Sequence, residues 1–332
     1  MTKKTIIILF TLGSIGIVLF APFFGMEKIS LNTILQFNPN NVQNNIFWRI
    51  RVPRVLIAFI AGSALAIGGM VFQAMFRNYL ATPFTLGVSS GAAFGAALYI
   101  KTGLLFSLFG IDGQTFFAFF GALLSIFFVY VLSMLKKGLS VGIMLLAGVA
   151  INFFFSGFIL FIQFISDFTH SFQIIRWLMG GFEIIGYNDI YNILPFTVIG
   201  TIIIIFLSTE LNLLTLGEDI AISRGVNLLK TKRILFFATS LMISGVISIV
   251  GPIGFVGMMV PHISRLVLNS SDHRNLVFFN IVFGGAFLVF CDTLSRTLIA
   301  PAEIPVGVIT ALLGGPFFIW LLINNKTQNN TL

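Results

Sequence analysis

Charged residues are scarce in this chain of 332 residues: Asp, Glu, Lys and Arg together make up only 9%. A soluble domain carries about 25% charged residues. Hydrophobic residues make up 57% of the chain, and 40 residues are Phe. A soluble fold could not keep so much apolar surface away from water with so few charges. We therefore predict an all-α polytopic membrane protein.

Residues that carry chemistry are also few. The single cysteine, Cys291, excludes an intrachain disulfide and a cysteine-cluster metal site. The three histidines, His170, His262 and His273, lie too far apart to form a metal-ligand pattern. Nowhere does G-x-x-x-x-G-K-[ST] occur, and the glycine-rich segment 251–257 lacks the lysine of that phosphate loop. We predict no enzyme, no cofactor and no metal in this chain, so any ATP hydrolysis would belong to a separate subunit.

Long apolar runs take the place of these features. A helix needs about 20 apolar residues to cross a bilayer. The runs without Asp, Glu, Lys or Arg are 5–26, 55–76, 78–100, 113–135, 138–166, 190–209, 234–264, 275–291 and 304–325. The run 234–264 is too long for one span and contains the helix-breaking sequence Gly251-Pro-Ile-Gly254. Splitting it into a helix ending near Val250 and a shorter helix over about 255–268 gives ten predicted transmembrane helices.

Basic residues predict the orientation of these helices. With the N-terminus in the cytoplasm, 12 of the 19 basic residues and four of the 11 acidic residues fall on the cytoplasmic side. The outer side then holds seven of each sign and is neutral. This asymmetry follows the positive-inside rule and predicts that both termini are cytoplasmic. The net charge of +8 is thereby explained by membrane topology, and we predict no nucleic-acid partner.

Arg49, Arg51 and Arg54 cluster where the second predicted span begins, on the outer side. Two interpretations remain open. The arginines could snorkel at the membrane interface, with apolar stems in lipid and charged heads in water. Alternatively, they could form a docking site for an acidic partner outside the membrane.

Small residues recur at helical spacing within the spans. The second span carries Ala58, Gly62, Ala66 and Gly69 on one face, followed by Gln73, and the third carries Gly87, Gly91 and Gly95. Small residues four apart let helix backbones approach closely in lipid. We predict packing seams along both spans, with Gln73 hydrogen-bonded to a neighbouring helix.

The longest charged segment on the cytoplasmic side is 210–233. Within it, 217–227 reads as a short helix, with Glu218 and Asp219 in its first turn and Arg224 in its last. These charges complement the helix dipole, and Gly225 is a suitable stop. The segment is either a plain connector or a rigid element that transmits motion from a cytoplasmic partner.

Together these motifs carry a resemblance to a known family. The chain resembles the permease subunits of the ABC importers (type II) for cobalamin, ferric siderophores and haem, from about Arg51 to Leu322. The blocks that carry it are Arg51-Val-Pro-Arg54, Arg77-Asn78, Leu145-Leu-Ala-Gly148, Trp177-Leu-Met-Gly180, the 217–227 segment, Gly251-Pro-Ile-Gly-Phe-Val-Gly257, Val260-Pro-His-Ile-Ser-Arg265, Arg296-Thr-Leu-Ile-Ala-Pro301, Glu303-Ile-Pro-Val-Gly307 and Thr310-Ala-Leu-Leu-Gly314. One departure is Tyr79, which replaces the proline of the family's Asn-Pro-Leu-Ala sequence.

The resemblance implies a single transmembrane permease domain over 1–332 in a bacterial cytoplasmic membrane. It implies four kinds of partner: a second permease subunit, identical or homologous; an ATPase dimer that holds ATP and Mg²⁺; a substrate-binding protein outside; and the bilayer. It also implies roles for individual residues: binding-protein docking for Arg51, Arg54 and Arg296; ATPase coupling, in the cytoplasmic loop 210–233, for Gly217, Glu218, Asp219, Ala221, Arg224 and Gly225; and an inner gate for Asn78, Leu80, Val141 and Gly142.

Cargo and energy source remain as alternatives. An iron–siderophore complex is favoured because it is the commonest cargo of the family, with haem or cobalamin as alternatives in the same importer class. A more distant alternative is an ion-coupled secondary transporter. It is disfavoured because no stretch carries several carboxylates near the middle of a span. A membrane-embedded enzyme has no supporting set of residues.

Overall fold

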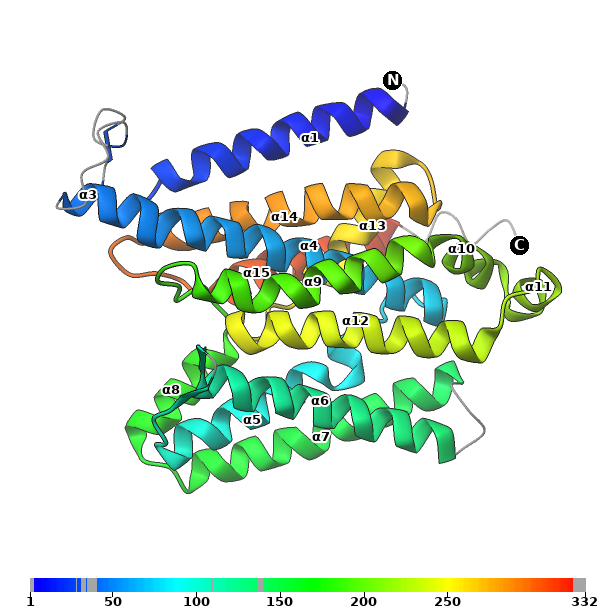
Figure 1. Cartoon of the computed structure of the whole chain (residues 1–332), viewed down its shortest axis with the longest axis horizontal. Coiled ribbons are helices and arrows are strands. Elements are labelled where there is room, and N and C mark those ends of the chain that lie inside the picture. Colours follow the sequence, from blue (N-terminus) through cyan, green and yellow to red (C-terminus); the bar gives the residue numbers. More distant parts are fainter. Residues whose placement is uncertain are drawn as a thin grey trace.

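The computed structural model describes residues 3–27, 29–30, 34, 41–108, 110–135 and 140–324, and within these residues the chain is almost wholly helical. Long helices run side by side along one axis (Figure 1). The end of this bundle where α4 begins is called the outer end, and the end where α4 finishes is called the inner end, in keeping with the predicted orientation.

The elements follow one another in this order: α1 (Lys3–Phe20), a 3-10 turn (Ala21–Phe23), α3 (Val42–Asn45), a π-helical turn (Ile46–Arg51), α4 (Val52–Phe76), a 3-10 turn (Phe84–Leu86), α5 (Val88–Thr102), β1 (Ser107–Leu108), β2 (Ile111–Asp112), α6 (Gly113–Leu135), α7 (Val141–Phe164), α8 (Phe168–Leu178), α9 (Asn188–Phe206), α10 (Ser208–Leu216), α11 (Glu218–Ser223), α12 (Leu228–Val250), α13 (Val256–Leu268), α14 (His273–Thr297) and α15 (Val306–Asn324). The two strands pair antiparallel and form a small outer hairpin.

Each predicted span contains a helix, although not every boundary is where we expected it. Seven helices of the described chain are long and apolar enough to cross a membrane, and α13 and α15 contain shorter apolar stretches. The predicted break in 234–264 is confirmed, because α12 ends at Val250 and α13 begins at Val256. The prediction for 78–100 was too long. Its helix begins only at Val88, after Pro83 and a left-handed Gly87, so 77–86 forms a turn segment. The count of ten membrane crossings and the orientation stay predictions.

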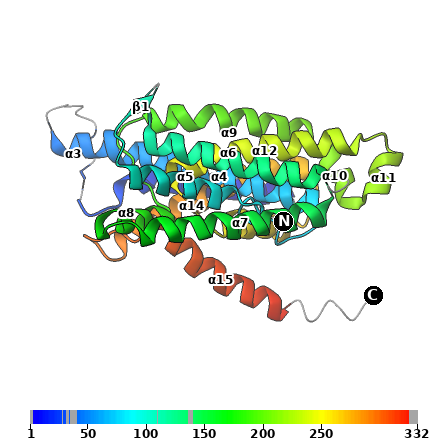
Figure 2. The same ribbon diagram turned by 90° about the horizontal axis from the view of Figure 1, so that it is seen from below.

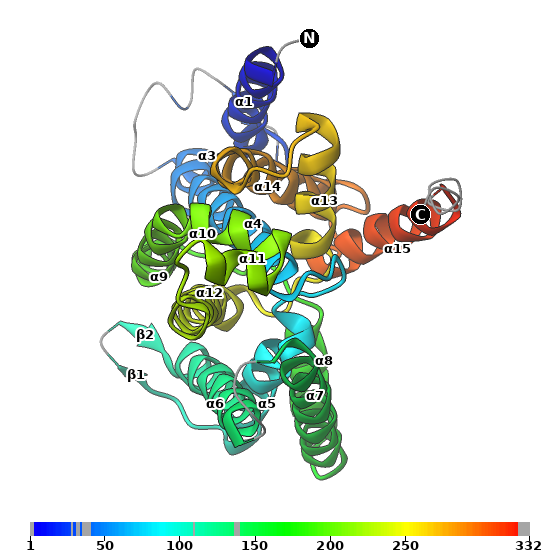
Figure 3. The same cartoon turned by 90° about the vertical axis from the view of Figure 1, so that its right-hand side faces the viewer.

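The helix α4 lies at the centre of the fold and α1 at its edge (Figures 1 and 3). In the apolar window of the α4 segment, 83% of the residues are buried, against 17% for α1. Helices α5 to α8 form a group on one side of α12, and α15 diverges from the other helices toward its C-terminal end (Figures 2 and 3). Residues on α4 therefore see neighbours on all sides, whereas α1 and α15 offer most of their surface to their surroundings.

The predicted packing seams are confirmed. A Cβ at Gly62 would overlap the carbonyl oxygen of Gly284 on α14, and a Cβ at Gly69 would overlap that of Gly257 on α13. On the third predicted span, Gly91 and Gly95 lie in the same way against backbone of α6. Close backbone contact of this kind is how helices associate where lipid supplies no hydrophobic drive.

The predicted role of Gln73 is also confirmed. Its side-chain amide donates to the carbonyl oxygens of Gly257 and Met258, at 3.4 and 3.3 Å, and its oxygen accepts a bond from Arg265. Gln73 therefore joins the inner half of α4 to α13 just beyond the glycine contact.

Three chain segments meet as bare backbone near the outer end. Gly181 N–H donates to the carbonyl of Val250 at 2.9 Å, and Gly307 N–H donates to that of Gly180 at 3.3 Å. Gly180 has φ of +66° and lies against the carbonyl of Pro252, so a side chain there would be both strained and obstructed. This junction joins the end of α8, the α12–α13 turn and the start of α15.

We predict that Gly69→Ala will lower the thermal unfolding temperature of the purified protein markedly, because its methyl group would have to push the α13 backbone away. Overpacking of this kind costs about 1–3 kcal/mol or more. Gly157→Ala on α7 is the matched control, since no atom lies within 4 Å of its added Cβ. It should leave the unfolding temperature unchanged or raise it. Equal behaviour of the two variants would contradict the packing argument.

Candidate functional site

A network of buried charges lies at the outer end, between α4 and α14. Arg54 Nε donates to Asp292 Oδ1 at 2.8 Å, and Arg54 Nη1 donates to Glu303 Oε2 at 2.8 Å. The Asp292 side chain is fully buried, and Arg296 Nε lies 3.3 Å from its other oxygen, Oδ2. Two arginines therefore neutralise one buried carboxylate, and Arg54 carries the connection outward to Glu303, whose side chain is half exposed.

The guanidinium groups of Arg51 and Arg296 hold the chain that follows α1. Arg51 donates to the carbonyl oxygens of Pro22, Phe23 and Glu27, at 3.1, 3.4 and 2.6 Å. Arg296 donates to those of Ala21 and Phe24, each at 2.8 Å. These five bonds attach the segment 21–27 to the outer ends of α4 and α14.

The structure brings the three predicted docking arginines together, but it does not expose them. Arg51, Arg54 and Arg296 are only 6%, 8% and 5% exposed, because each is bonded inside the chain. The interpretation of Arg51 and Arg54 as arginines that snorkel toward water is wrong for the same reason. Docking by these residues stays a prediction, and it now requires an acidic partner to displace their internal acceptors.

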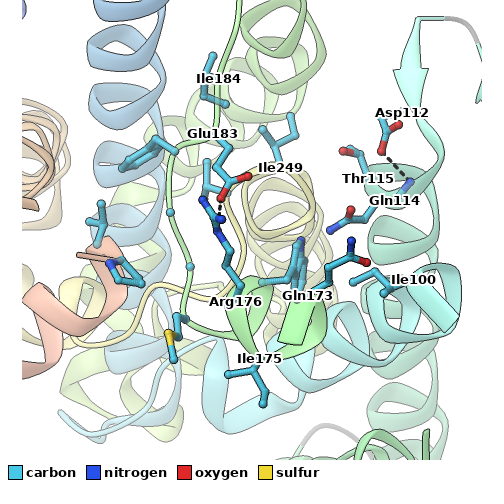
Figure 4. Close-up of a pocket in the computed structure, with 18 of the residues that line it drawn as sticks. Ile100, Asp112, Gln114, Thr115, Gln173, Ile175, Arg176, Glu183, Ile184 and Ile249 are labelled. Atoms are coloured by element: carbon cyan, nitrogen blue, oxygen red, sulfur yellow. Dashed lines mark hydrogen bonds and ion pairs between the residues drawn. The ribbon is translucent and has the colours of Figure 1, made fainter. Parts of the chain in front are cut away.

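An open cavity of about 1240 Å³ lies beside this network at the outer end. Its wall includes the last turn of α5, the start of α6, α8 and the glycine junction, and it reaches Arg54 and Glu303. Figure 4 shows Arg176 at the end of α8 joined to Glu183, with their side-chain atoms 2.7 Å apart. Across the cavity, Asp112 accepts a bond from the backbone of Gln114 at 2.9 Å. Backbone of the glycine junction, at Gly180 and Gly181, forms part of its wall.

The predicted inner-gate residues lie on two separate segments. Asn78 follows α4, and its side-chain oxygen accepts a bond from Leu80 N–H at 2.9 Å. Leu80 itself is 60% exposed. Val141 and Gly142 form the first turn of α7, after the N-cap Ser140. No hydrogen bond or ring contact within the described chain joins the two pairs, so the gate stays a prediction.

The predicted cytoplasmic helix is confirmed in kind but is shorter than 217–227. It is α11, six residues long, with Gly217 as N-cap and Glu218 and Asp219 in its first turn. The stop at Gly225 is confirmed: Gly225 N–H donates to Ile222 O at 2.9 Å, and Val226 N–H donates to Ala221 O at 3.0 Å. These two hydrogen bonds, together with the φ of +85° at Gly225, form a Schellman motif.

The surface predicted for α11 needs correction. The resemblance implies a role in ATPase coupling for Ala221, but its side chain is fully buried within this chain. Ile220 and Ile222 are exposed instead, at 45% and 56%. Glu218 is paired with Lys232 of α12 at 2.7 Å. The ion pair thus attaches α11 to α12 at the inner end of the bundle (Figure 1), and the two isoleucines of α11 are exposed there.

Several side-chain partners are not predicted by local sequence patterns. Asp292 and Glu303 are two of them, although their charge and their position near span ends match those of Arg54. Asn212 on α10 is another: it donates to Asp272 at 2.8 Å and so joins α10 to α14. Bonds from Arg274 and Asn212 hold the pKa of Asp272 well below its ordinary value. Opposite charges at matching span ends were the available signal for the first pair.

We predict that Arg54→Ala will destabilise the protein strongly, since it leaves buried Asp292 with a weaker partner and Glu303 with none. Removing one member of a buried ion pair costs about 3–5 kcal/mol. Glu303→Gln is the matched control, because it removes only the half-exposed carboxylate and should cost about 1 kcal/mol or less. Thermal unfolding of the two purified variants measures the difference, and similar unfolding temperatures would refute the asymmetry.

Comparisons with known proteins agree over nearly the whole chain. The model of the FecCD transport family matches residues 9–324. The hemin transport system permease protein HmuU of Yersinia pestis is 36% identical over 311 residues, which are 92% of this chain and 91% of that protein. The cobalamin import system permease protein BtuC of Halobacterium salinarum is 38% identical over 89% of this chain and 78% of its own length.

A solved structure shows the same fold. It is an ABC transporter of the metal-chelate type in an inward-facing conformation, with a TM-score of 0.84 and 29% identity, over 97% of this chain and 99% of its own. Its multi-pass helical architecture is that of the present chain, with apolar helices that fit a bacterial inner membrane. Family model, relatives and solved fold therefore coincide, and the chain belongs to the FecCD transport family of ABC transporter permeases.

Proposed function

We propose that this chain is the permease subunit of an ATP-driven importer of chelated metal. The observation that best supports this proposal is the match of the fold, over 97% of the chain, to a metal-chelate type ABC transporter. The cargo that we propose is an iron–siderophore complex, with haem or cobalamin as the alternatives. Relatives are named for hemin and for cobalamin, so one scaffold serves chemically distinct cargoes.

Energy would enter through α11. A cytoplasmic ATPase dimer, with ATP and Mg²⁺ bound to it, would hold the exposed Ile220 and Ile222 in an apolar groove. The Schellman motif and the Glu218–Lys232 pair make α11 stiff, so a push on it moves α12 rather than bending the loop. Movement must come from a difference in how the ATPase contacts the two conformations of the permease.

Cargo would arrive at the outer end from a substrate-binding protein. The arginine network lies there beside the open cavity, and a second permease subunit, identical or homologous, would complete the transporter. A docking carboxylate would have to compete with Glu303 for Arg54. Charge pairs of this kind mainly set encounter rate and orientation.

We predict that a bacterial strain lacking this gene will lose uptake of one chelated metal and regain it from a plasmid copy. Labelled iron on several siderophores, haem and cobalamin should be supplied in parallel, with and without depletion of ATP. Uptake that stops with ATP depletion supports the importer. Uptake that survives ATP depletion but collapses with the ion gradient would instead identify a secondary transporter.

We predict that Ile222→Glu will leave the amount of permease in the membrane unchanged but reduce ATP-driven uptake about tenfold or more, because an unpaired carboxylate is costly in an apolar contact. Ile222→Leu is the matched control and should transport normally. Ala221→Arg should behave differently and lower the amount of folded protein, since that side chain is buried inside the loop. Normal uptake by Ile222→Glu would exclude α11 from coupling.

A further inference from the structure

Arg265 on α13 is a cation without an anionic partner. Within the described chain, no carboxylate lies at ion-pair distance from its guanidinium. Its one hydrogen-bond partner there is the side-chain oxygen of Gln73. None of its nitrogens is among the buried atoms that lack a partner, so its remaining N–H donors reach the surface. These donors are therefore available to a ligand at the inner end.

Aromatic rings surround this guanidinium. It stacks on the ring of Tyr79, 4.8 Å from the ring centre. Tyr79 in turn meets the edge of His262, and His262 meets Phe317 of α15, at centroid distances of 6.1 and 6.0 Å. Phe317 continues the row to Trp320 at 6.2 Å. The row thus links the segment after α4 to α13 and α15.

Both ends of this row are open. Tyr79 is 64% exposed and Trp320 is 53% exposed, and α15 diverges from the other helices over this stretch (Figures 2 and 3). Gln73 and Tyr79 fix the position of the guanidinium from the α4 side. Its remaining N–H donors therefore have a fixed position but no acceptor within the described chain. We call Tyr79, His262, Arg265, Phe317 and Trp320 the aromatic–arginine surface.

Tyr79 supplies both the ring that stacks on Arg265 and the ring contact with His262. It therefore places an aromatic group beside a cation, and both are groups that recognise ligands.

We propose that the aromatic–arginine surface binds the cargo at the inner end, and that this cargo is an anionic aromatic metal chelate. An aromatic plane stacks on exposed rings, while an oxygen anion takes the free donors of Arg265. A catecholate complex of iron or a tetrapyrrole with carboxylates has both properties, and a neutral hydroxamate complex has neither. This inference rests on the proposed function, which it narrows to one chemical class of cargo.

Lipid is the competing source of an anion. Arginine, tyrosine and tryptophan also gather at membrane interfaces, where basic pockets between helices take lipid phosphates. A phosphate could bind Arg265, but it has no aromatic plane that could stack on the row of rings. The experiment must therefore separate an aromatic chelate from a lipid headgroup.

The full-length permease in lipid nanodiscs should be titrated with two iron(III) chelates that share metal and octahedral geometry: a tris-catecholate, which is aromatic and triply negative, and an uncharged tris-hydroxamate. Binding is read from quenching of tryptophan fluorescence, with empty nanodiscs as the blank. We expect the tris-catecholate to bind at least about tenfold more tightly to the wild type. Tyr79→Leu and Arg265→Gln should each remove about tenfold, whereas Tyr79→Phe, which keeps the ring, should bind as the wild type does.

Tyr79 is exposed, so Tyr79→Leu should fold normally and keep the test valid even if Arg265→Gln does not fold. Equal binding of the two chelates, or unchanged binding by Tyr79→Leu, would overturn the proposal. So would displacement of the tris-catecholate by phosphatidylglycerol in the nanodiscs, because that result identifies a lipid-phosphate site. The proposed function is tested separately in cells: it is refuted if the gene restores ATP-driven uptake of no chelate to the strain that lacks it.

Discussion

Backbone contact between α4 and its neighbours is the constraint on which the remaining structure depends. In lipid, apolar side chains gain little by leaving one apolar environment for another, so helices must be held by close packing and by polar bonds. At Gly62 and Gly69 the absence of a side chain lets α14 and α13 reach the α4 backbone. These contacts hold α13 and α14 against α4. The outer charge network, through Arg54, and the inner Gln73–Arg265 contact therefore both depend on this one helix.

Local patterns in the sequence predict much of this architecture for physical reasons. Hydropathy locates the spans because a helix that crosses the bilayer must be apolar. Glycine and proline predict the break at 251–254, since they interrupt helices. Small residues at helical spacing indicate the packing seams. Short helices such as α8 and α10 escaped prediction, since they are not apolar along their whole length. The late start of α5 at Val88 was also missed, because 78–87 is uncharged without being helical.

Side-chain partners across long stretches of chain were not predictable in the same way. Arg54 and Asp292 are 238 residues apart, and nothing local to either of them indicates the other. An arginine at a span end looks alike in sequence whether it faces water or is neutralised inside the fold. The burial of Ala221 raises the same difficulty, since a short cytoplasmic helix shows no sign of which face packs on its own chain.

The hydrogen bonds that attach the segment 21–27 to the bundle affect how the N-terminal part of such proteins can change over evolution. Arg51 and Arg296 bind it through carbonyl oxygens, which every amino acid supplies, and most of α1 faces outward. Selection on the identity of these side chains is therefore weak, apart from Gly25, whose added Cβ would overlap Arg51. The first helix is free to diverge as long as it stays apolar, because its attachment depends on backbone atoms and not on side chains.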